Sequence, residues 1–429
     1  MTLILLFTGL LLLIGLGFPV LLAIGATAFF GIIATEGLVP ALFPQKMLAM
    51  LDSFSLLALP YFILAGELMS RGGLSKKLVF FAEAIVGHLR GGLGHASVVS
   101  SMIFAGVSGS STADTSAIGS ILIPSMKERG YKPGFAAAMV ACAGTIGAII
   151  PPSMTMIVYG SMTGVSIGAL FLGGIIPGVL IGFGLMLVIY LYSLNEDFPE
   201  LRQVSGGFSF PVALRALGSV WLALLAPVII IGGILTGIFT ATEAGVVACI
   251  YSYIVAFYVY RIIGWKDLPA ILIDTAVTTA MVVGIIGVAG ALGWLLSYLD
   301  FNDTVLGLIK HISGSPTGVL LSLLGIMLIL TMFVESLAVM VILVPVCAYI
   351  GQQYHIDPVH LGLLVTIATQ IGATTPPVAV LLFVATSIAG TTYDQTVKYC
   401  WAFIAAEISI LILVVFVPQT VTWIPNTFL

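Results

Sequence analysis

The sequence predicts an all-α polytopic membrane protein made of two inverted repeats, each with a re-entrant helical hairpin and a broken transmembrane helix. The first observation is composition: of 429 residues, 60% are hydrophobic and only 7% are charged, with a mean hydropathy of +1.21. A soluble domain has about 25% charged residues. The second is a heptapeptide that occurs twice, as IGAIIPP at 146–152 and IGATTPP at 371–377. The third is a strong asymmetry of basic residues between the halves.

Each heptapeptide is predicted to break a helix. A Pro pair removes two backbone donors and disfavours helix at the residue before it. Unwound backbone is tolerated in hydrocarbon only where protein or a water-filled cavity satisfies it, and matched interrupted spans point to a transporter's binding site. A simple proline kink would explain one copy, but two matched copies favour a site.

The first half opens with two spans, and the N-terminus lacks the basic region and cleavage site of a signal peptide, so we expect the first span to be retained. A polar stretch that includes Lys46 then leads to the third span. Residues 75–90 are too charged to face lipid and are expected to form an interfacial amphipathic helix. The expected elements are spans at 2–17, 19–35 and 55–70, the amphipathic helix at 75–90, a hairpin at 92–126, a broken helix at 133–163, a span at 166–194 and a polar loop at 195–210.

The expected hairpin at 92–126 is apolar at both ends and polar in its middle, 108–116. A single crossing would place hydroxyls and an acid at the centre of the bilayer. A re-entrant hairpin instead places this polar tip in a cavity lined by protein.

The second half repeats this order. Its hairpin carries Glu335 and Ser336 in the middle. The expected elements are spans at 213–237, 242–260 and 270–297, an amphipathic helix at 300–312, a hairpin at 316–350, a broken helix at 359–389 and a closing span at 400–424.

Basic residues indicate opposite orientations for the two hairpins. Seven lie in 71–132, whereas the matching stretch 296–360 contains only Lys310. By the positive-inside rule the first hairpin opens to the cytoplasm and the second to the outside, with both termini outside. The residues expected at the cytoplasmic face are Arg71, Lys76, Lys77, Arg90, Lys127, Arg129, Lys132, Arg202, Arg215, Arg261, Lys266 and Lys398, which leaves Lys46 and Lys310 outside.

Three other classes of function are disfavoured. Residues 106–109 (GVSG) fit the GxSG motif of intramembrane serine proteases, but all five histidines fall at or near predicted membrane ends, so no base reaches Ser108. An aspartyl protease would need Asp114 and Asp274 to face each other, and neither lies in a supporting motif. TEAG at 242–245 resembles a coupling loop for an ATPase only weakly. The four cysteines are scattered in apolar runs and indicate neither metal binding nor disulfides.

The hairpin tips and breaks offer oxygen ligands and no basic side chain, which suits Na⁺ together with a carboxylate held by helix N-termini. Small-residue packing is the alternative explanation for the hydroxyls, and Asp114 and Glu335 suit a structural role equally well. The expected sodium site 1 comprises Ser108, Ser110, Asp114, Gly144 and Gly147. The expected sodium site 2 comprises Glu335, Ser336, Thr369 and Gly372. The expected substrate contacts are Ser111, Thr112, Thr374 and Thr375.

Several stretches resemble the large membrane (M) subunit of TRAP transporters, over nearly the whole chain. They are SGSS at 108–111 with Ala113-Asp114, GIFTATEA at 237–244, HIDPVHLG at 355–362 and the two IGAxxPP breaks. The chain departs from the family pattern at three positions: Ala241 replaces a Pro, Gly245 replaces an Ala, and Ala379 replaces a Gly.

The resemblance implies an elevator-type, Na⁺-coupled importer of an organic acid, typically a C4-dicarboxylate or sialic acid. It implies two partners, a small membrane Q subunit and a periplasmic P protein that delivers the substrate, in the bacterial inner membrane. A transport domain would comprise 55–165 and 262–390, and a scaffold 1–54, 166–261 and 391–429. No enzymatic activity, cofactor or nucleic-acid partner is expected. A stand-alone two-hairpin dicarboxylate carrier is the alternative within transport.

Overall fold

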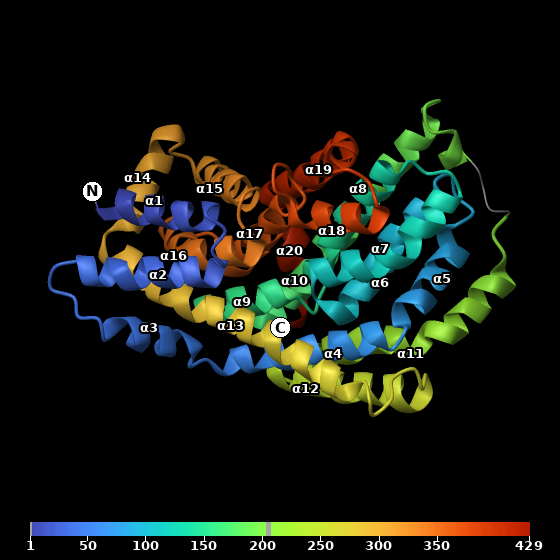
Figure 1. Ribbon diagram of the computed structural model, residues 1–429, viewed down its shortest axis with the longest axis horizontal. Helices are drawn as coiled ribbons and strands as arrows, with labels where there is room; N and C mark the ends of the chain where they lie inside the picture. Colours follow the sequence, from blue (N-terminus) through green and yellow to red (C-terminus); the bar gives the residue numbers. More distant parts are fainter. Residues whose placement is uncertain (1, 203–206) are drawn as a thin grey trace.

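Every regular element in the described residues, 2–202 and 207–429, is a helix in the computed structural model (Figure 1). Seven of these helices are long and apolar enough to cross a membrane, and α14 with α15 would add an eighth. The chain changes direction by 114° between α14 and α15, so the two are an amphipathic helix followed by a hairpin arm and not one span. The prediction of a polytopic all-α membrane protein is confirmed.

The first repeat contains the elements predicted for it. Its hairpin consists of two helices joined by Gly109 and Ser110, and its broken helix is interrupted around a cis Pro151-Pro152 bond. The bounds are α1 Thr2–Gly15, α2 Val20–Ala34, α3 Leu42–Leu51, α4 Ala58–Arg71, α5 Leu74–Val86, α6 Gly92–Ser108, α7 Ser111–Glu128, α8 Pro133–Gly144, a 3₁₀ turn Thr145–Ala148, α9 Met154–Thr163 and α10 Ile167–Leu194.

The second repeat follows the same order, with a cis Pro376-Pro377 bond in its break. The bounds are α11 Phe210–Leu235, α12 Ala241–Ile254 continued by a π-helical turn Val255–Val259, α13 Leu268–Tyr298, α14 Phe301–Ile312, α15 Pro316–Thr331, α16 Ser336–Gln353, α17 Pro358–Gly372, α18 Val380–Ala389, α19 Tyr393–Phe416 and α20 Gln419–Phe428. The hairpins α6–α7 and α15–α16 approach the centre from opposite ends of the molecule, so the repeats are inverted (Figure 1).

Three elements differ from the sequence prediction. The stretch before the third span contains a helix, α3, whose Met47 and Met50 pack against glycines of α13. The closing span is two helices, because Pro418 follows Val417, whose backbone is not helical (φ −124°, ψ 74°). The loop at 195–210 contains a short 3₁₀ helix, Pro199–Arg202, and residues 203–206 of that loop lie outside the described part of the chain.

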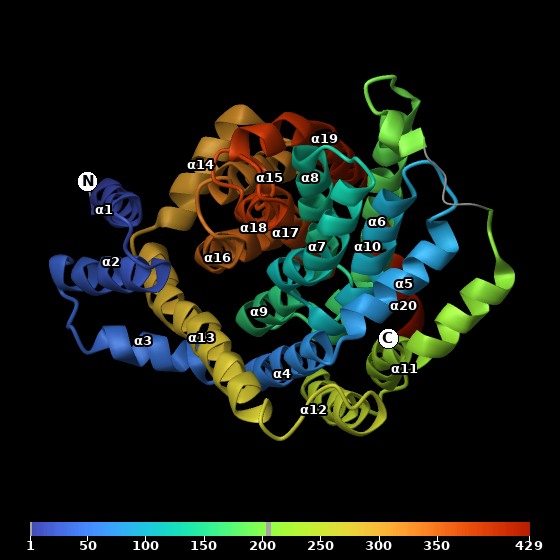
Figure 2. The same cartoon turned by 45° about the vertical axis from the view of Figure 1, so that its right-hand side comes forward.

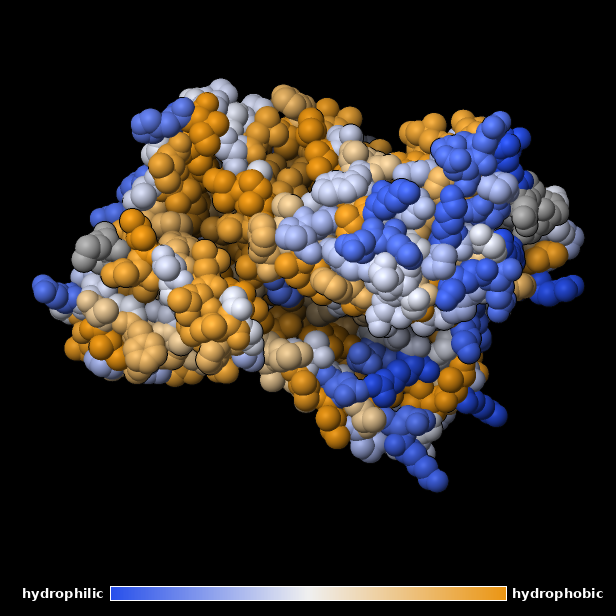
Figure 3. Space-filling view, turned by 45° about the horizontal axis from the view of Figure 1, so that its top comes forward, coloured by the Kyte–Doolittle hydropathy of each residue, from blue (hydrophilic) through white to orange (hydrophobic). Residues whose placement is uncertain are grey.

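The longest helix, α13, runs diagonally across the molecule from α14 towards α12 (Figure 2). It packs against α2, α3, α4 and α16, and so joins the opening helices to the second hairpin. Hydrophilic residues gather at one end of the molecule, the right-hand end in Figure 3, where α5, α7 and the start of α8 lie. This end carries most of the basic residues expected to face the cytoplasm, but the orientation in the membrane stays a prediction.

Candidate transport site

Four helices begin at the same central cavity of about 90 Å³. Its lining residues include the first residues of α7, α9, α16 and α18, which are Ser111, Met154, Ser336 and Val380. Among the described residues that line it there is no lysine, arginine or histidine. Because unpaired backbone N–H groups and the positive ends of helix dipoles point out of helix N-termini, this convergence suits an anion.

Three of these helices have a side chain that caps the N-terminus. Ser110 accepts a hydrogen bond from the Ala113 amide at 3.4 Å, and Ser153 accepts one from the Met156 amide at 3.3 Å. Glu335 caps α16 by accepting from the Ala338 amide at 3.1 Å. The fourth helix, α18, has no side-chain cap. Each interrupted span thus ends and restarts at the cavity, as the paired Gly/Pro signals predicted.

Hairpin 1 and the first break bring together four of the residues expected for sodium site 1, Ser108, Ser110, Asp114 and Gly147, whereas Gly144 lies against Ser111 and Thr115 of α7. Ser108 Oγ donates to Asp114 Oδ1, and the Asp114 carboxylate lies directly against Gly147, where a Cβ would overlap it. Asp114 is fully buried, and its Oδ2 has no hydrogen-bond partner among the described residues. A buried carboxylate oxygen that has no hydrogen-bond partner among the described residues fits a cation. Ser108 donates to a carboxylate. A serine protease would need this serine to donate to a histidine, so the contact disfavours the protease.

Hairpin 2 and the second break bring together the residues expected for sodium site 2. Ser336 Oγ donates to the Thr369 carbonyl at 3.1 Å, and Glu335 lies at the cavity lining. Gly372 lies against Thr331 of α15, and a Cβ at this position would overlap the threonine hydroxyl. Each break therefore places a glycine against its own hairpin, which explains the glycine in both heptapeptides.

The four residues expected to contact substrate divide into two pairs. Ser111 and Thr112 line the cavity. Thr374 and Thr375 are not among its lining residues, because both hydroxyls donate to the Ile371 carbonyl, at 2.8 and 2.7 Å. In this structure the two threonines of the second heptapeptide cap the end of α17 and do not face the space between the hairpin tips.

A buried glutamine that the sequence analysis did not select connects the two repeats. Gln370 of α17 accepts a hydrogen bond from Ser111 Oγ at 2.5 Å and reaches Thr155 of α9 at 3.5 Å. It also lines the cavity. The signal was a polar residue in an apolar helix, directly before the second heptapeptide. Such a residue has to find a partner inside the protein, and here the partner is the opposite hairpin tip.

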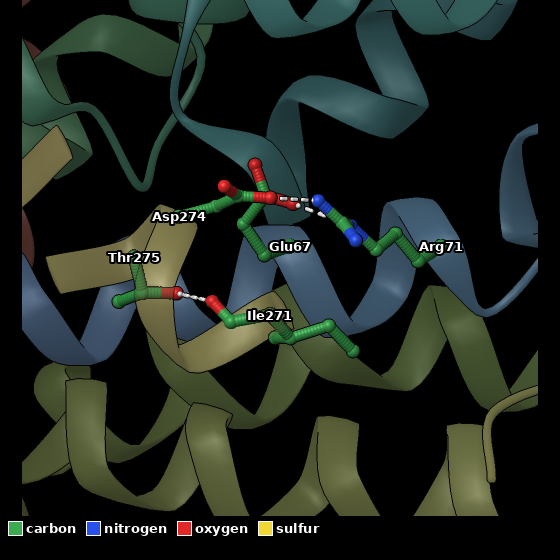
Figure 4. A network of polar contacts seen from close by, with 5 residues as sticks. All are labelled: Glu67, Arg71, Ile271, Asp274 and Thr275. Carbon is green, nitrogen blue, oxygen red and sulfur yellow. Dashed lines mark hydrogen bonds and ion pairs between the residues drawn. The ribbon is translucent and has the colours of Figure 1, made fainter. Parts of the chain in front are cut away.

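A second, larger cavity of about 610 Å³ adjoins the first and shares Ser110, Thr112 and Met154 with it. Glu67 lines this cavity and belongs to an ion-pair network between α4 and α13 (Figure 4). Arg71 donates to Glu67 at 3.2 Å and to Asp274, which lies one turn after Ile271. These side chains are partly exposed, so the network contributes little stability. It does place charged groups at one end of the larger cavity.

The fold is that of a membrane protein with two hairpins and two broken helices, and comparison with known proteins gives the family. Residues 7–420 match the family described as "Tripartite ATP-independent periplasmic transporter, DctM component". The chain belongs to this family, and the resemblance noted in the sequence is confirmed. It is a multi-pass membrane component of a TRAP transporter.

Two relatives show how substrates vary in the family. The C4-dicarboxylate TRAP transporter large permease protein DctM of Pseudomonas aeruginosa is 38% identical over 89% of this chain and 88% of its own length. The sialic acid TRAP transporter large permease protein SiaM of Vibrio cholerae is 34% identical over 90% of this chain and 89% of its own. Both relatives are permeases.

Solved structures share the fold, and one example is a bacterial membrane protein. MtrF of Neisseria gonorrhoeae, described within a class of antimetabolite efflux pumps, superposes with a TM-score of 0.55 over 87% of this chain and 83% of its own. Its sequence identity is 12%, so the likeness concerns the arrangement of helices alone.

Proposed function

We propose that the protein carries out Na⁺-coupled secondary uptake of an organic acid, either a C4-dicarboxylate or sialic acid. The observation that carries the proposal is the cavity at which four helix N-termini meet. Among the described residues that line it there is no basic side chain, and Asp114 on the same hairpin is buried with one carboxylate oxygen, Oδ2, that has no hydrogen-bond partner. Such a cavity binds an anion only if cations bind with it.

The energies explain why cations are needed. A helix N-terminus stabilises an anion by about 0.3–1 kcal/mol when exposed and by about 2 kcal/mol when partly buried. Removing an unpaired carboxylate from water costs several kcal/mol or more. Asp114 and Glu335 also add negative charge close to the substrate. Na⁺ ions bound at both acids would neutralise this charge and remove the repulsion, so that the helix N-termini could attract the substrate.

The two proposed ion sites follow the two hairpins. At site 1, Asp114, Ser108 and Ser110 would act with the carbonyls of Gly144 and Gly147. At site 2, ligands would come from Glu335, Ser336, Thr369 and Gly372. Oxygen-only ligand sets of this kind suit a hard cation.

The substrate would bind between the tips against Ser111 and Thr112, with Gln370 as a further contact. The small cavity suits one carboxylate group, and the adjoining larger cavity has room for the rest of the molecule. Because the larger cavity lies beside Glu67 and near Arg71, on the side predicted to face the cytoplasm, we assign this structure to an inward-facing state. The relatives' names support both substrates, dicarboxylate and sialic acid.

The partners proposed are those of a tripartite system, a small membrane Q subunit and a periplasmic P protein that delivers the substrate, in the bacterial inner membrane. Transport would follow an elevator movement of the hairpins and broken helices against a scaffold. The family description, which names a tripartite periplasmic transporter, supports the two partners and says nothing of the movement.

The test is uptake into proteoliposomes that contain the chain and its Q subunit, with substrate-loaded P protein outside. An inward Na⁺ gradient should drive uptake of one of the two acids with a sigmoidal dependence on Na⁺ concentration. Asp114→Asn should lower the apparent Na⁺ affinity at least about tenfold, which corresponds to about 1.4 kcal/mol.

Asp394→Asn is the matched control, because Asp394 is exposed in the first turn of α19 and far from the hairpin tips in sequence. It should retain the wild-type Na⁺ dependence. Equal uptake when choline replaces Na⁺, or uptake driven by a proton gradient alone, would refute the coupling. Full uptake without the P protein would indicate a stand-alone carrier.

A further inference from the structure

Among the described residues that line the central cavity, Gln370 carries the only amide side chain. The residue is 4% exposed. Its Oε1 accepts the hydrogen of the Ser111 hydroxyl at 2.5 Å, whereas its Nε2 lies 3.5 Å from the Thr155 hydroxyl, at the limit of hydrogen-bond range. In this structure the amide carbonyl is therefore well paired, and the amide nitrogen has only one long contact among the described residues.

The Gln370 amide lies between the two hairpin tips. Ser111, to which it is bonded, is the first residue of α7. Thr369, its neighbour in the chain, accepts a hydrogen bond at its carbonyl from Ser336, the first residue of α16, at 3.1 Å. A carboxylate held by the N-termini of α7 and α16 would therefore have the Gln370 amide beside it.

The Ser111 hydroxyl has one hydrogen, and two acceptors compete for it once an acid is bound. In this structure the hydrogen goes to Gln370. A bound carboxylate would take it instead, because a hydrogen bond to an ionised acceptor is roughly twice as strong as one between neutral groups. Oε1 of Gln370 would then be buried without a donor, which is unfavourable. An acid that fits this site has to supply a hydrogen to Oε1 itself.

A hydroxyl on the carbon next to the carboxylate supplies that hydrogen. The oxygen and the nitrogen of an amide are bound to one carbon, so an acceptor and a donor stand side by side. An α-hydroxy acid presents the complementary pair: its hydroxyl donates to Oε1 while a carboxylate oxygen accepts from Nε2. Glu335, the one carboxylate at the lining among the described residues, already accepts from the Ala338 amide and belongs to the proposed sodium site 2.

We propose that Gln370 is the specificity-determining residue of this cavity and selects α-hydroxy carboxylates over the same acids without the hydroxyl. This selectivity rests on the proposed function, because it requires that the cavity binds the carboxylate of an organic acid. It narrows that function to malate rather than succinate among C4-dicarboxylates. It also includes sialic acid, in which the carbon next to the carboxylate bears a hydroxyl.

The test is direct binding to the full chain with its Q subunit in nanodiscs, without the P protein, so that the selectivity of the P protein does not enter. The measurement is the dissociation constant in Na⁺ for two matched pairs of probes, malate (both enantiomers) with succinate, and sialic acid with its 2-deoxy analogue. In the pair that binds, the hydroxy acid should bind at least about tenfold more tightly, because a site built to bond a hydroxyl rejects the analogue that lacks it.

Gln370→Met removes the amide and keeps the length of the side chain. It should reduce the preference within the pair to about twofold or less, mainly by weakening the binding of the hydroxy acid. Gln353→Met is the matched control, because Gln353 is exposed at the end of α16 that lies away from the hairpin tip. This variant should keep the wild-type preference.

Equal affinities within the pair that binds, measured on the wild-type chain, would overturn the selectivity and leave the proposed function standing. This outcome needs no variant, so it decides the matter even if Gln370→Met folds poorly. A well-folded Gln370→Met that retains the full preference, with a thermal unfolding midpoint like that of the wild type, would assign the hydroxyl contact to another residue. Binding of neither pair in Na⁺ would overturn the proposed function and the selectivity together.

Discussion

Ala379, the residue before α18, has a left-handed backbone (φ 45°, ψ 71°). This conformation costs a residue with a Cβ about 1–2 kcal/mol, whereas glycine adopts it freely. The family resemblance leads us to expect a glycine at this position. The structure shows that the backbone keeps the glycine-like conformation despite the Cβ.

Ala379→Gly should therefore stabilise the protein by about 1 kcal/mol, which includes a small loss from the more flexible unfolded chain. The measurement is the midpoint of thermal unfolding in detergent. Ala385→Gly, in the middle of α18, is the matched control and should lower stability by about 1 kcal/mol, because glycine is unfavourable inside a helix. If both variants shift the unfolding midpoint in the same direction, the backbone of Ala379 is not strained.

At the scale of residues, the sequence identified the side chains at the two hairpin tips better than those beneath them. Ser108, Asp114 and Glu335 stand beside glycines in short polar runs, so their position at a tip was predictable. Gln370 and Glu407 are isolated polar residues in apolar helices. Their presence signalled a buried partner, but the partner lies 259 residues away for Gln370 and 262 for Glu407. Only the tertiary structure connects them.

At the scale of elements, the contacts of α19 bear on the division between transport domain and scaffold. The sequence analysis placed 391–429 with the scaffold, and this division stays a prediction. Yet hydrogen bonds join α19 to the first break, where Thr145 donates to Glu407 at 2.7 Å, and to α18, where Thr386 Oγ1 lies 2.9 Å from Thr396 Oγ1. A third joins His360 of α17 to the Val414 carbonyl of α19. These bonds favour a closing helix that moves with the broken helices.

A disulfide between α18 and α19 would distinguish these two possibilities. Thr386→Cys with Thr396→Cys should form one, because adjacent hydroxyls at 2.9 Å imply Cβ atoms within disulfide range. The background would lack the four native cysteines. We expect oxidised protein to retain most of its uptake, measured against reduced protein and both single-cysteine variants. Uptake abolished by oxidation and restored by reduction would place α19 in the scaffold.

Most elements could be predicted because hydrophobic length and Gly/Pro interruptions are local signals. The hairpins and breaks carry such signals, and the structure contains all four. Helix α3 lacked one, since it is short and moderately polar and forms against the glycines of α13. The split between α19 and α20 had a local signal, Pro418, near the end of a run long enough to pass as one span.

At the scale of the whole molecule, the inverted repeats predict which ends face the cytoplasm. In a cysteine-free background, Glu128→Cys should react with an impermeant thiol reagent only from the cytoplasmic side, and Gln352→Cys only from the outside. Both positions are exposed, so a lack of reaction would report on the side of the membrane and not on burial. Labelling of both positions from one side would contradict the proposed orientation.

The shared cavity is the feature of the whole molecule that sequence reasoning reached only in part. The duplicated heptapeptides and polar tips predicted a site between the repeats. They did not predict that the hydroxyls of Thr374 and Thr375 bond to the Ile371 carbonyl instead of lining the cavity. This orientation depends on the backbone at the end of α17, for which the sequence contains no local signal. The bond from Ser111 to Gln370 likewise depends on how deeply the hairpins enter.

The two acids of the proposed ion sites are not equivalent, although the repeats are. Asp114 lies inside α7 and is sealed from solvent, whereas Glu335 caps α16 at the cavity lining and remains partly exposed. If both hold Na⁺, the ion at Glu335 exchanges with the cytoplasm rapidly and the ion at Asp114 leaves only after hairpin 1 loosens. Binding and release would then follow a fixed sequence, with the enclosed ion the slowest to depart, and that departure would set the rate at which the carrier can return for another substrate.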